Sequence, residues 1–366
     1  MSEIEFFKGS IFCYRVFDVS FEIDLETLKD KLTQTGLSRS FEFKRVSRNL
    51  VMSHMPLLVG VDSWKQVFNN KTYEINAFAK VFSFGAVSVC LQINVEAGVP
   101  WRDAVLFSAF LDSDPAIHDT CAGLAIKLLE NIKPKAEILK CLWNQCEDYI
   151  LFIYDPGFYH AEHIKSLIQN ESVMHLVMLQ EPSKLSEQMK HSFLATIFQY
   201  GPDDLAAIEW NCGFVCSEDD SQDIADVLEF ALTQLTELRY FDDLLDRKLA
   251  SLYNATKQFG PRIFSSQYSK VANEASSLYI EISQTVEKVE NSIKVVGDFY
   301  YAKIYRAAVE KFRIKDWQGS IDTKLNNLIE VSRVLKSDVD TRRALILEIA
   351  VVVLFLIEVF PFFKKF

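Results

Sequence analysis

The stretch FVCSEDDSQDIADVLEFALTQLTELRYFDDLLDRKLASLYNATKQF, residues 214–259, divides the 366-residue chain into two kinds of sequence. It contains neither glycine nor proline, and Asp219 and Ser221 near its head are residue types that begin helices. Apolar residues then recur every seven positions from Ile224 to Leu252. The pattern predicts one helix of about 37 residues, roughly 55 Å long, whose apolar stripe must pack against another element.

The residues before this stretch have the glycine and proline content of a turn-rich domain. Nine of the twelve glycines and seven of the nine prolines precede residue 214, so the earlier part is broken into short elements. Alternation and apolar runs predict strands at Ser10–Ile23, Glu42–Val61, Tyr73–Val95, Tyr149–Tyr154 and Ala206–Val215, and helical spacing predicts a helix within Trp101–Ile132. We therefore expect an α+β domain with a mixed sheet over residues 1–220.

The residues after it continue the helical pattern. Gly260 and Pro261 mark the expected end of the first long helix, and apolar runs at 278–296 and 321–339 predict two more, separated near Gly297 and Gly319. The apolar rows are wider than the two-position seam of a coiled coil, which favours an intramolecular antiparallel bundle over 221–343. An intermolecular coiled coil is the alternative.

Charge and cysteine content restrict the class of protein. The net charge is −11, which argues against a protein that coats nucleic acid, although residues 247–343 carry 17 Lys and Arg against 11 Asp and Glu. No DNA partner is expected. Seven cysteines fit no closed disulfide framework and indicate reduced thiols. The start shows neither a secretory signal nor an organelle presequence, so the folded part is expected to stay cytoplasmic.

The tail RRALILEIAVVVLFLIEVFPFFKKF, residues 342–366, predicts a single transmembrane helix at 344–363. Its apolar residues favour insertion by on the order of 7 kcal/mol, and Glu348 and Glu358 oppose it. Because the two glutamates are about 80° apart around a helix, they define one polar side suited to a partner. Positive charge precedes the segment, so we expect a single-pass C-terminal anchor in contact with membrane lipids, with a buried core helix as the alternative.

Five stretches carry a family resemblance. They are VFSFGAVSV (81–89), DLAAIEWNCGFV (204–215), VLEFALTQLTELRYFDDLLDRKLASLY (227–253), FYYAKIYRAAVEKFRIKDWQGSIDTKL (299–325) and RRALILEIAVVVLFLIEV (342–359). On these residues the chain resembles the "required for meiotic nuclear division" family, a former domain of unknown function. The resemblance implies an α+β domain, a helical region and a C-terminal membrane segment, and it supplies no catalytic residue to carry over.

That family includes members linked to mitochondrial translation and to meiosis, and one organelle member looks like a self-associating anchor for the translation machinery. Because this chain lacks an import presequence, we expect a bacterial member at the inner membrane, with the N-terminal domain facing the cytoplasm.

One group of residues could serve a metal. His160 and His163 stand three positions apart in YDPGFYHAEH, and Asp155 or Glu162 could complete a site. Two histidines fall short of a defined ligand set, so the sequence assigns no metal, cofactor or catalytic residue, and a polar surface turn is the simpler interpretation. A cytosol-facing metal-dependent enzyme using these residues remains the alternative function.

A second group is basic and aromatic. The stretch 299–317 interleaves cations with tyrosines, a phenylalanine and a tryptophan, which is typical of a helix with a solvated face and an aromatic core side. Contact with anionic headgroups or with RNA phosphates, including ribosomal RNA, is the functional interpretation. With the charged residues of the tail, the candidate partner surface comprises Lys303, Arg306, Lys311, Arg313, Lys315, Arg342, Arg343, Glu348 and Glu358.

Together these patterns predict a membrane-anchored, cytoplasm-facing scaffold that self-associates as a homo-oligomer and could dock the translation machinery or another assembly. No catalytic motif of high specificity is present in the sequence.

Overall fold

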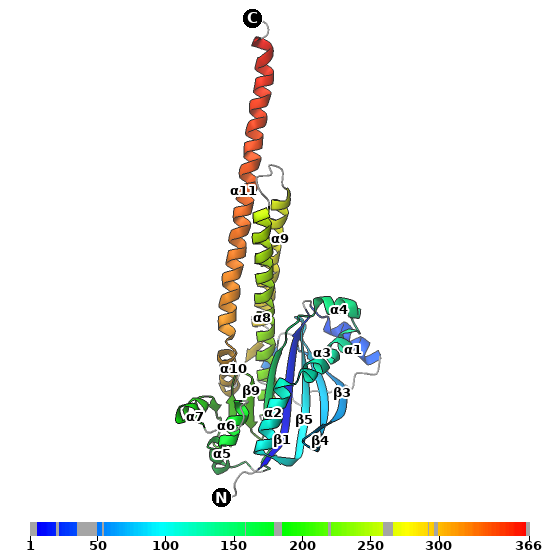
Figure 1. Ribbon diagram of the computed structural model, residues 1–366, viewed down its shortest axis with the longest axis vertical. Helices are drawn as coiled ribbons and strands as arrows, with labels where there is room; N and C mark the ends of the chain where they lie inside the picture. Colours follow the sequence, from blue (N-terminus) through cyan, green and yellow to red (C-terminus); the bar gives the residue numbers. More distant parts are fainter. Residues whose placement is uncertain are drawn as a thin grey trace. The chain divides into compact units, whose positions relative to one another are not determined.

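The computed structural model describes residues 6–19, 22–34, 50–52, 55–157, 159–178, 185–218, 221–258, 266–291, 293–295 and 299–363. The chain forms two compact units. The first comprises Met1–Tyr240 and Lys288–Lys315, and the second comprises Phe241–Glu287 and Asp316–Phe366. Three long helices, α8 (Ser221–Gln258), α9 (Ser266–Asn291) and α11 (Ile314–Phe363), contribute residues to both units (Figure 1).

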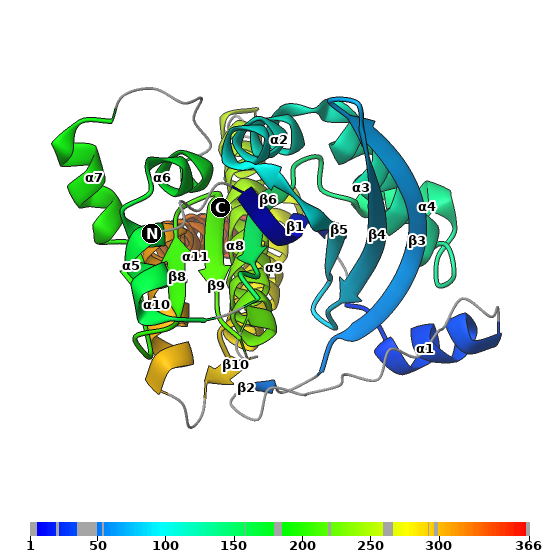
Figure 2. The same ribbon diagram turned by 90° about the horizontal axis from the view of Figure 1, so that it is seen from below.

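The first unit is built on an eight-stranded sheet with the order β3-β4-β5-β1-β6-β9-β8-β7, which can be followed from β3 to β8 in Figure 2. Its pairs are antiparallel except for β6 and β9, which run parallel. The strands are β1 (Phe6–Asp18), β3 (Leu57–Phe68), β4 (Lys71–Val81), β5 (Ala86–Pro100), β6 (Glu147–Tyr154), β7 (Ile197–Phe198), β8 (Leu205–Ile208) and β9 (Cys212–Cys216). Separately, β2 (Leu50–Met52) pairs with β10 (Ile293–Val295).

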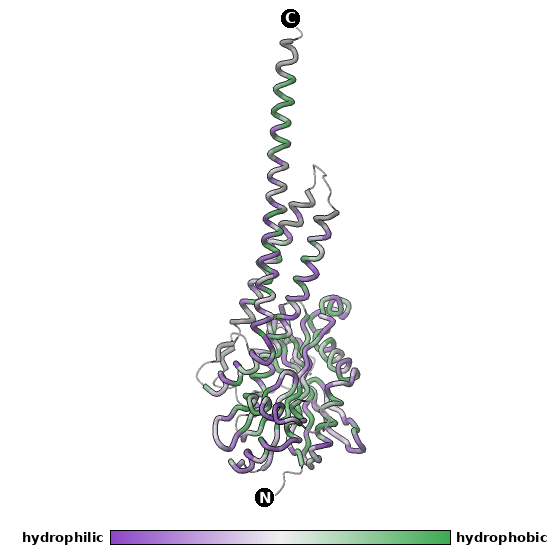
Figure 3. Tube along the Cα trace, turned by 60° about the vertical axis from the view of Figure 1, so that its left-hand side comes forward, coloured by the Kyte–Doolittle hydropathy of each residue, from purple (hydrophilic) through white to green (hydrophobic). Residues whose placement is uncertain are grey.

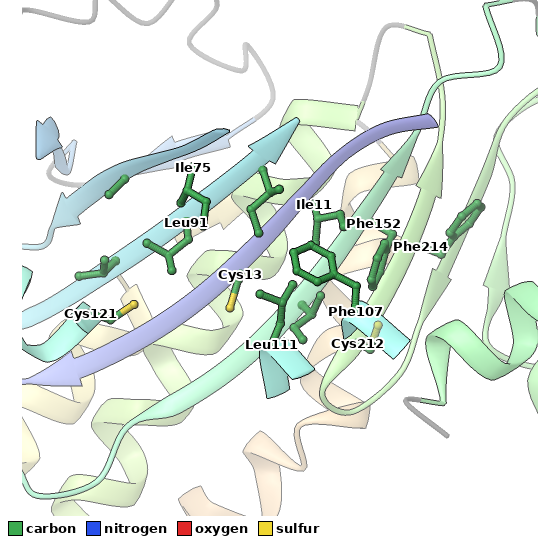
Figure 4. Packing of buried hydrophobic residues seen from close by; sticks show 14 of the residues in the cluster. Ile11, Cys13, Ile75, Leu91, Phe107, Leu111, Cys121, Phe152, Cys212 and Phe214 are labelled. Atoms are coloured by element: carbon green, nitrogen blue, oxygen red, sulfur yellow. The ribbon is translucent and has the colours of Figure 1, made fainter. Parts of the chain in front are cut away.

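Helices cover both faces of this sheet. Side chains alternate between faces along a strand, so Ile11 and Cys13 point toward one face while Tyr14 and Asp18 point toward the other. The first face packs against α2 (Trp101–Ser113), α3 (Pro115–Leu129) and α6 (Glu171–Val177), and its core includes Ile11, Phe107, Phe152 and Phe214 (Figure 4). The remaining helices of this part are α1 (Leu25–Gln34), α4 (Lys135–Cys141), α5 (Ala161–Ile168) and α7 (Glu187–Leu194).

The opposite face of the sheet receives the first half of α8 and the short helix α10 (Phe299–Lys311). Lys80 of β4 forms ion pairs with Asp226 and Glu229 of α8. The ring of Phe312, just after α10, meets that of Tyr149 of β6 edge to face, with centroids 5.5 Å apart. These contacts make α8 and α10 a second layer of the first unit.

A backbone irregularity in β1 gives a stability prediction. Gly9 has φ +143°, where the pairing of β1 with β5 shifts register, and a Cβ there would overlap the carbonyl oxygen of Ile153. Gly9→Ala is therefore expected to lower the free energy of unfolding by about 3 kcal/mol or more, through overlap and backbone strain. The control is Gly123→Ala in α3, where nothing lies within 4 Å and better helix propensity predicts a small gain. Urea unfolding curves measure both, and equal effects would contradict the assignment.

The second unit is a helical bundle made by the later part of α8, by α9 (Ser266–Asn291) and by α11 (Figure 1). Its interior contains Leu245, Ile282 and Leu328, one from each helix. Polar contacts also join the helices: the hydroxyls of Ser276 and Ser332 are 3.1 Å apart, and Lys324 Nζ lies 2.8 Å from Asp242 Oδ1 and 2.7 Å from Asp246 Oδ2. The later part of α8, α9 and α11 thus pack against one another within the chain.

The α+β sheet followed by long helices is confirmed, with local differences. The region 101–132 contains two helices, because Asp114 caps α3 and Pro115 occupies its first turn. The first long helix has 38 residues. Ile293 belongs to β10, and α11 passes through Gly319 without a break. The expected stops at Gly260, Pro261 and Gly297 lie outside the described residues.

The predicted transmembrane helix at 344–363 is wrong. Among the described residues, no helix combines the length and the apolar character needed to cross a bilayer. The single-pass C-terminal anchor and the inner-membrane location with a cytoplasmic N-terminal domain are wrong for the same reason.

Candidate functional site

The end of α11, residues 344–357, exposes large apolar side chains on every side of the helix. Leu354, Phe355, Leu356 and Ile357 are consecutive, and each is at least 60% exposed. Because successive residues turn by about 100°, four in a row point in all directions. In Figure 3 the outer part of α11 is coloured largely as hydrophobic. We call residues 344–357 the apolar end of α11; its other exposed large apolar residues are Leu345, Leu347, Ile349, Val351, Val352 and Val353.

Such a surface is unusual for a lone helix in water. A helix that is hydrophobic all round is normally buried, and large exposed apolar patches mark interaction sites. Burying one Leu, Ile, Val or Phe side chain stabilises by about 1.5–3 kcal/mol. The apolar end of α11 is therefore the strongest candidate for a binding surface in the described part of the chain.

The charged tail residues chosen from the sequence lie beside or within this surface. Glu348 is exposed within the apolar end. Arg343 is exposed and approaches Asp340 at 4.0 Å, a surface contact worth little by itself. The side chains of Arg342 and Glu358 lie outside the described part of the structure.

The cations chosen near α10 have different environments. Lys311 Nζ lies 2.7 Å from Glu209 Oε1, so this charge is paired. Lys303 Nζ lies over the ring of Phe198, 5.5 Å from its centroid. Arg306, Arg313 and Lys315 are exposed.

The aromatic residues of the same stretch belong largely to the interior. Tyr300, Tyr301 and Phe312 are buried, and the Tyr301 hydroxyl donates to Asp223 Oδ2 at 3.2 Å. This is the aromatic core side that the helical interpretation expects. These rings pack within the protein, so stacking on RNA bases would need other side chains. Contact with the ribosome or RNA stays a prediction.

The candidate metal residues lie around the end of β6 and the start of α5. Asp155 Oδ1 accepts a hydrogen bond from the Gly157 backbone N–H at 2.8 Å. The His163 ring stacks on Tyr154 with centroids 5.8 Å apart, and burial, followed by the nearby His160, lowers the pKa of His163. Within the described residues, no group of three or more His, Cys, Asp or Glu side chains is arranged to hold a metal ion.

The interface between α8 and the sheet holds buried charge that the sequence did not reveal. Lys80 Nζ lies 2.8 Å from Asp226 Oδ1 and 2.6 Å from Glu229 Oε2, and the Glu229 side chain is 3% exposed. Burial lowers the pKa of Lys80, but the two carboxylates raise it more strongly, so the net shift is upward. Lys80 is thus held as a cation by two anions and is unsuited to act as a base.

Two further acidic groups lie along the same interface. Glu147 forms an ion pair with Arg239, and burial raises the pKa of Glu147 to about 7 despite the opposing effect of Arg239. Glu237 faces Asp18, and both residues are 1% exposed.

The sequence could not identify these residues because the heptad pattern assigns one apolar stripe to α8. In the structure every residue from Val227 to Leu238 is buried, so polar positions outside that stripe are enclosed as well.

A cysteine and a histidine also lie in contact, although no motif in the sequence predicts this. Cys146 Sγ lies 3.2 Å from His118 Nδ1, although 28 positions separate them. Burial raises the pKa of the Cys146 thiol to about 12; Arg15 opposes this shift, while Asp148 and Glu147 add to it. A thiol with a raised pKa is a poor nucleophile, so this pair lacks the activation of a catalytic cysteine.

Alkylation tests this assignment. At about pH 8 the thiolate fraction of Cys146 should be roughly a thousandfold below that of an unperturbed thiol, so iodoacetamide should modify it correspondingly slowly in the folded chain. Peptide mass spectrometry of the folded and urea-unfolded chain gives the comparison. Equal modification rates in the two states would show that the folded environment does not suppress the thiolate.

Comparison with known proteins places most of the first unit in a family. The family model for the N-terminal domain of the uncharacterized protein MJ0711 matches residues 8–223. The uncharacterized protein MJ0711 of Methanocaldococcus jannaschii is 20% identical over 219 residues, which cover 58% of this chain and 65% of that protein. The chain therefore spans just under two thirds of the length of this curated relative. No solved structure matches.

Proposed function

We propose that this chain, which belongs to the MJ0711 N-terminal domain family, is a non-enzymatic scaffold that assembles with further copies of itself through the apolar end of α11. The observation that carries the proposal is the exposure of apolar side chains all around residues 344–357. A single groove on a partner would cover only one side of such a helix. Several identical helices side by side cover all of it.

Copies of the same helix also account for its sequence. The apolar end has no polar stripe that would face solvent in a one-sided complex, and Glu348 is the only charged residue between Ala344 and Ile357. In a parallel assembly the Glu348 side chains of all copies lie at the same level, where like charges limit stability unless they reach water or are protonated. The interface thus combines the burial of many apolar side chains with one layer of ionisable Glu348 side chains.

The proposal assigns no chemical step to the first unit. Lys80 is bound by two carboxylates, and the pKa of Cys146 is raised away from the range of a nucleophile. These features favour a structural role for the polar groups that are most enclosed.

Sedimentation equilibrium of the full-length chain tests self-assembly. We expect a discrete mass that is a multiple of 42.0 kDa and that dissociates on dilution. A 42.0 kDa monomer at about 10 µM, or a polydisperse mixture without a defined stoichiometry, would overturn the proposal.

We also propose that the MJ0711 family is related to the "required for meiotic nuclear division" family. Support comes from the resembling stretches 81–89 and 204–215, which both lie in the sheet of the first unit. The former spans the end of β4 and the start of β5, and the latter contains β8 and most of β9. A solved structure of a member of the meiotic division family tests this. A sheet with a different strand order from β3-β4-β5-β1-β6-β9-β8-β7 would contradict it.

A further inference from the structure

Three exposed aromatic side chains lie around α10, outside the buried rings of that helix. Phe299 at its start is 77% exposed, Tyr200 after β7 is 73% exposed, and Trp210 between β8 and β9 is 55% exposed. Exposed aromatic residues are characteristic of binding surfaces, where their flat rings supply much of the contact. Tyr200 and Trp210 are far from α10 in the sequence, so only the fold brings the three together.

Contacts along β8 place these rings at the two ends of α10. Because β7 pairs antiparallel with β8, Tyr200 lies past the start of β8, whereas Trp210 follows its end. At the first end the ring centroids of Tyr200 and Tyr300 are 5.5 Å apart. At the second end Lys311 Nζ lies 2.7 Å from Oε1 of Glu209, the neighbour of Trp210. α10 therefore runs along β8 (Figure 2), over about 20 Å at 1.5 Å per residue.

The exposed side of α10 carries positive charge between those two ends. Lys303 and Arg306 are exposed and three positions apart, so they lie on the same side of the helix. Lys303 Nζ lies 5.5 Å from the ring centroid of Phe198, and Arg306 Nε donates to the carbonyl oxygen of Ala302 at 3.1 Å. In the described part of the chain neither cation forms an ion pair. The exposed acid on this helix is Glu310.

We propose that the exposed side of α10, with the rings at its two ends, binds single-stranded nucleic acid. Bases stack on the rings of Tyr200, Phe299 and Trp210. Phosphates bind Lys303 and Arg306. Proteins hold single strands by combining cations that follow the backbone with aromatic rings that accept any base, and this surface has both. The site goes beyond the self-assembly proposed above and does not depend on it.

The arrangement favours a single strand over other anionic partners. The bases of a duplex are already stacked on one another, so the exposed rings offer it nothing. A lipid surface is best met by apolar side chains gathered on one face, whereas these rings are separated along α10 by cations. The net charge of −11 keeps binding local, because the rest of the chain repels phosphates.

Fluorescence anisotropy of a labelled dodecauridylate, titrated with the full-length chain in about 50 mM salt, tests the proposal. We expect a dissociation constant on the order of 10 µM that weakens as salt is added. A 12-base-pair RNA duplex should bind at least tenfold more weakly. Equal affinity for the duplex, or no binding of the single strand below about 1 mM, would overturn the proposal. A dodecathymidylate in parallel distinguishes RNA from DNA as the preferred strand.

Variants of exposed residues locate the site. Phe299→Ala and Tyr200→Ala should each weaken binding at least fivefold through lost stacking. Arg306→Gln should lower the slope of log affinity against log salt by about 0.7. The matched controls are Phe6→Ala, at a 52% exposed ring on β1, and Arg102→Gln, at an exposed position on α2. Both should leave affinity and slope nearly unchanged; if they act as strongly as the α10 variants, binding is not at this site.

Two further measurements separate stacking from plain attraction of charge. Trp210 emission should be quenched when the oligonucleotide binds, and the quenching should disappear in Trp210→Phe. Glu310→Gln should strengthen binding severalfold, because it removes the acid beside the cations. Vesicles containing phosphatidylserine complete the test. Binding of vesicles that is lost in Phe299→Ala, without binding of either oligonucleotide, would assign the surface to lipid headgroups and refute the proposal.

Discussion

Lys80→Met is expected to lower the free energy of unfolding of the first unit by about 3–5 kcal/mol, because it leaves Asp226 and Glu229 without their cation at a buried interface. Methionine keeps most of the side-chain volume, so the loss reports the missing charge more than a cavity. Urea unfolding followed by tryptophan fluorescence measures the effect, since Trp101 and Trp143 are buried in this unit.

Two further variants show whether the loss of stability comes from the buried charge. Lys71→Met at the other end of β4 removes a cation that lies 3.7 Å from Asp103 at an exposed site, and it should cost less than about 1 kcal/mol. Adding Asp226→Asn and Glu229→Leu to Lys80→Met should restore most of the stability, because the uncompensated carboxylates are then gone. A Lys71→Met effect as large as that of Lys80→Met, or no restoration, would contradict the role given to the buried charge.

The second large effect concerns assembly. Leu347→Gln, Leu354→Gln and Phe355→Gln together should weaken self-association by roughly a thousandfold or more, at about 1.5–3 kcal/mol for each apolar side chain no longer buried. The three residues are at least 65% exposed in the single chain, so the bundle of the second unit should keep its stability. Sedimentation equilibrium gives the dissociation constant, and circular dichroism checks the helix content.

The control replaces exposed apolar residues elsewhere in the same unit. Ile280→Gln in α9 and Val334→Gln in α11 change side chains that are 55% and 57% exposed but lie outside the apolar end. These changes should leave the assembly nearly unaltered. If they weaken it as strongly as the changes at Leu347, Leu354 and Phe355, the interface lies on another face of the helices.

Hydrophobic periodicity identified most of the elements. Most of the alternating segments became strands of the eight-stranded sheet, although β2 pairs with β10 outside it and the segment Ala206–Val215 holds parts of two strands, β8 and β9. The glycine-free stretch after residue 221 became the 38-residue α8, because both patterns reflect local geometry that the chain enforces by itself. The positions at which helices end were predicted less accurately. Gly319 lies within α11, where helical contacts on either side outweigh the weak preference of one glycine to end a helix.

Less of the candidate sites than of the fold could be predicted from the sequence. The apolar end of α11 was found from composition, but composition could not separate a membrane segment from a surface for protein contacts. His160, His163 and Asp155 are close in sequence, yet no three-ligand group forms in the described residues. The buried polar contacts that the sequence did not reveal, Lys80 with Glu229 and Cys146 with His118, join residues 149 and 28 positions apart.

The sequence by itself determined the division into an α+β part and long helices, since the periods of 2 and about 3.6 residues and the placement of glycine and proline are local properties. Only the tertiary structure decided which polar groups lose water. The first half of α8 is enclosed by the rest of the first unit, so side chains outside its apolar stripe become buried and must find charge partners or protons. Solvent exclusion is a property of the assembled layers, and no spacing along the chain encodes it directly.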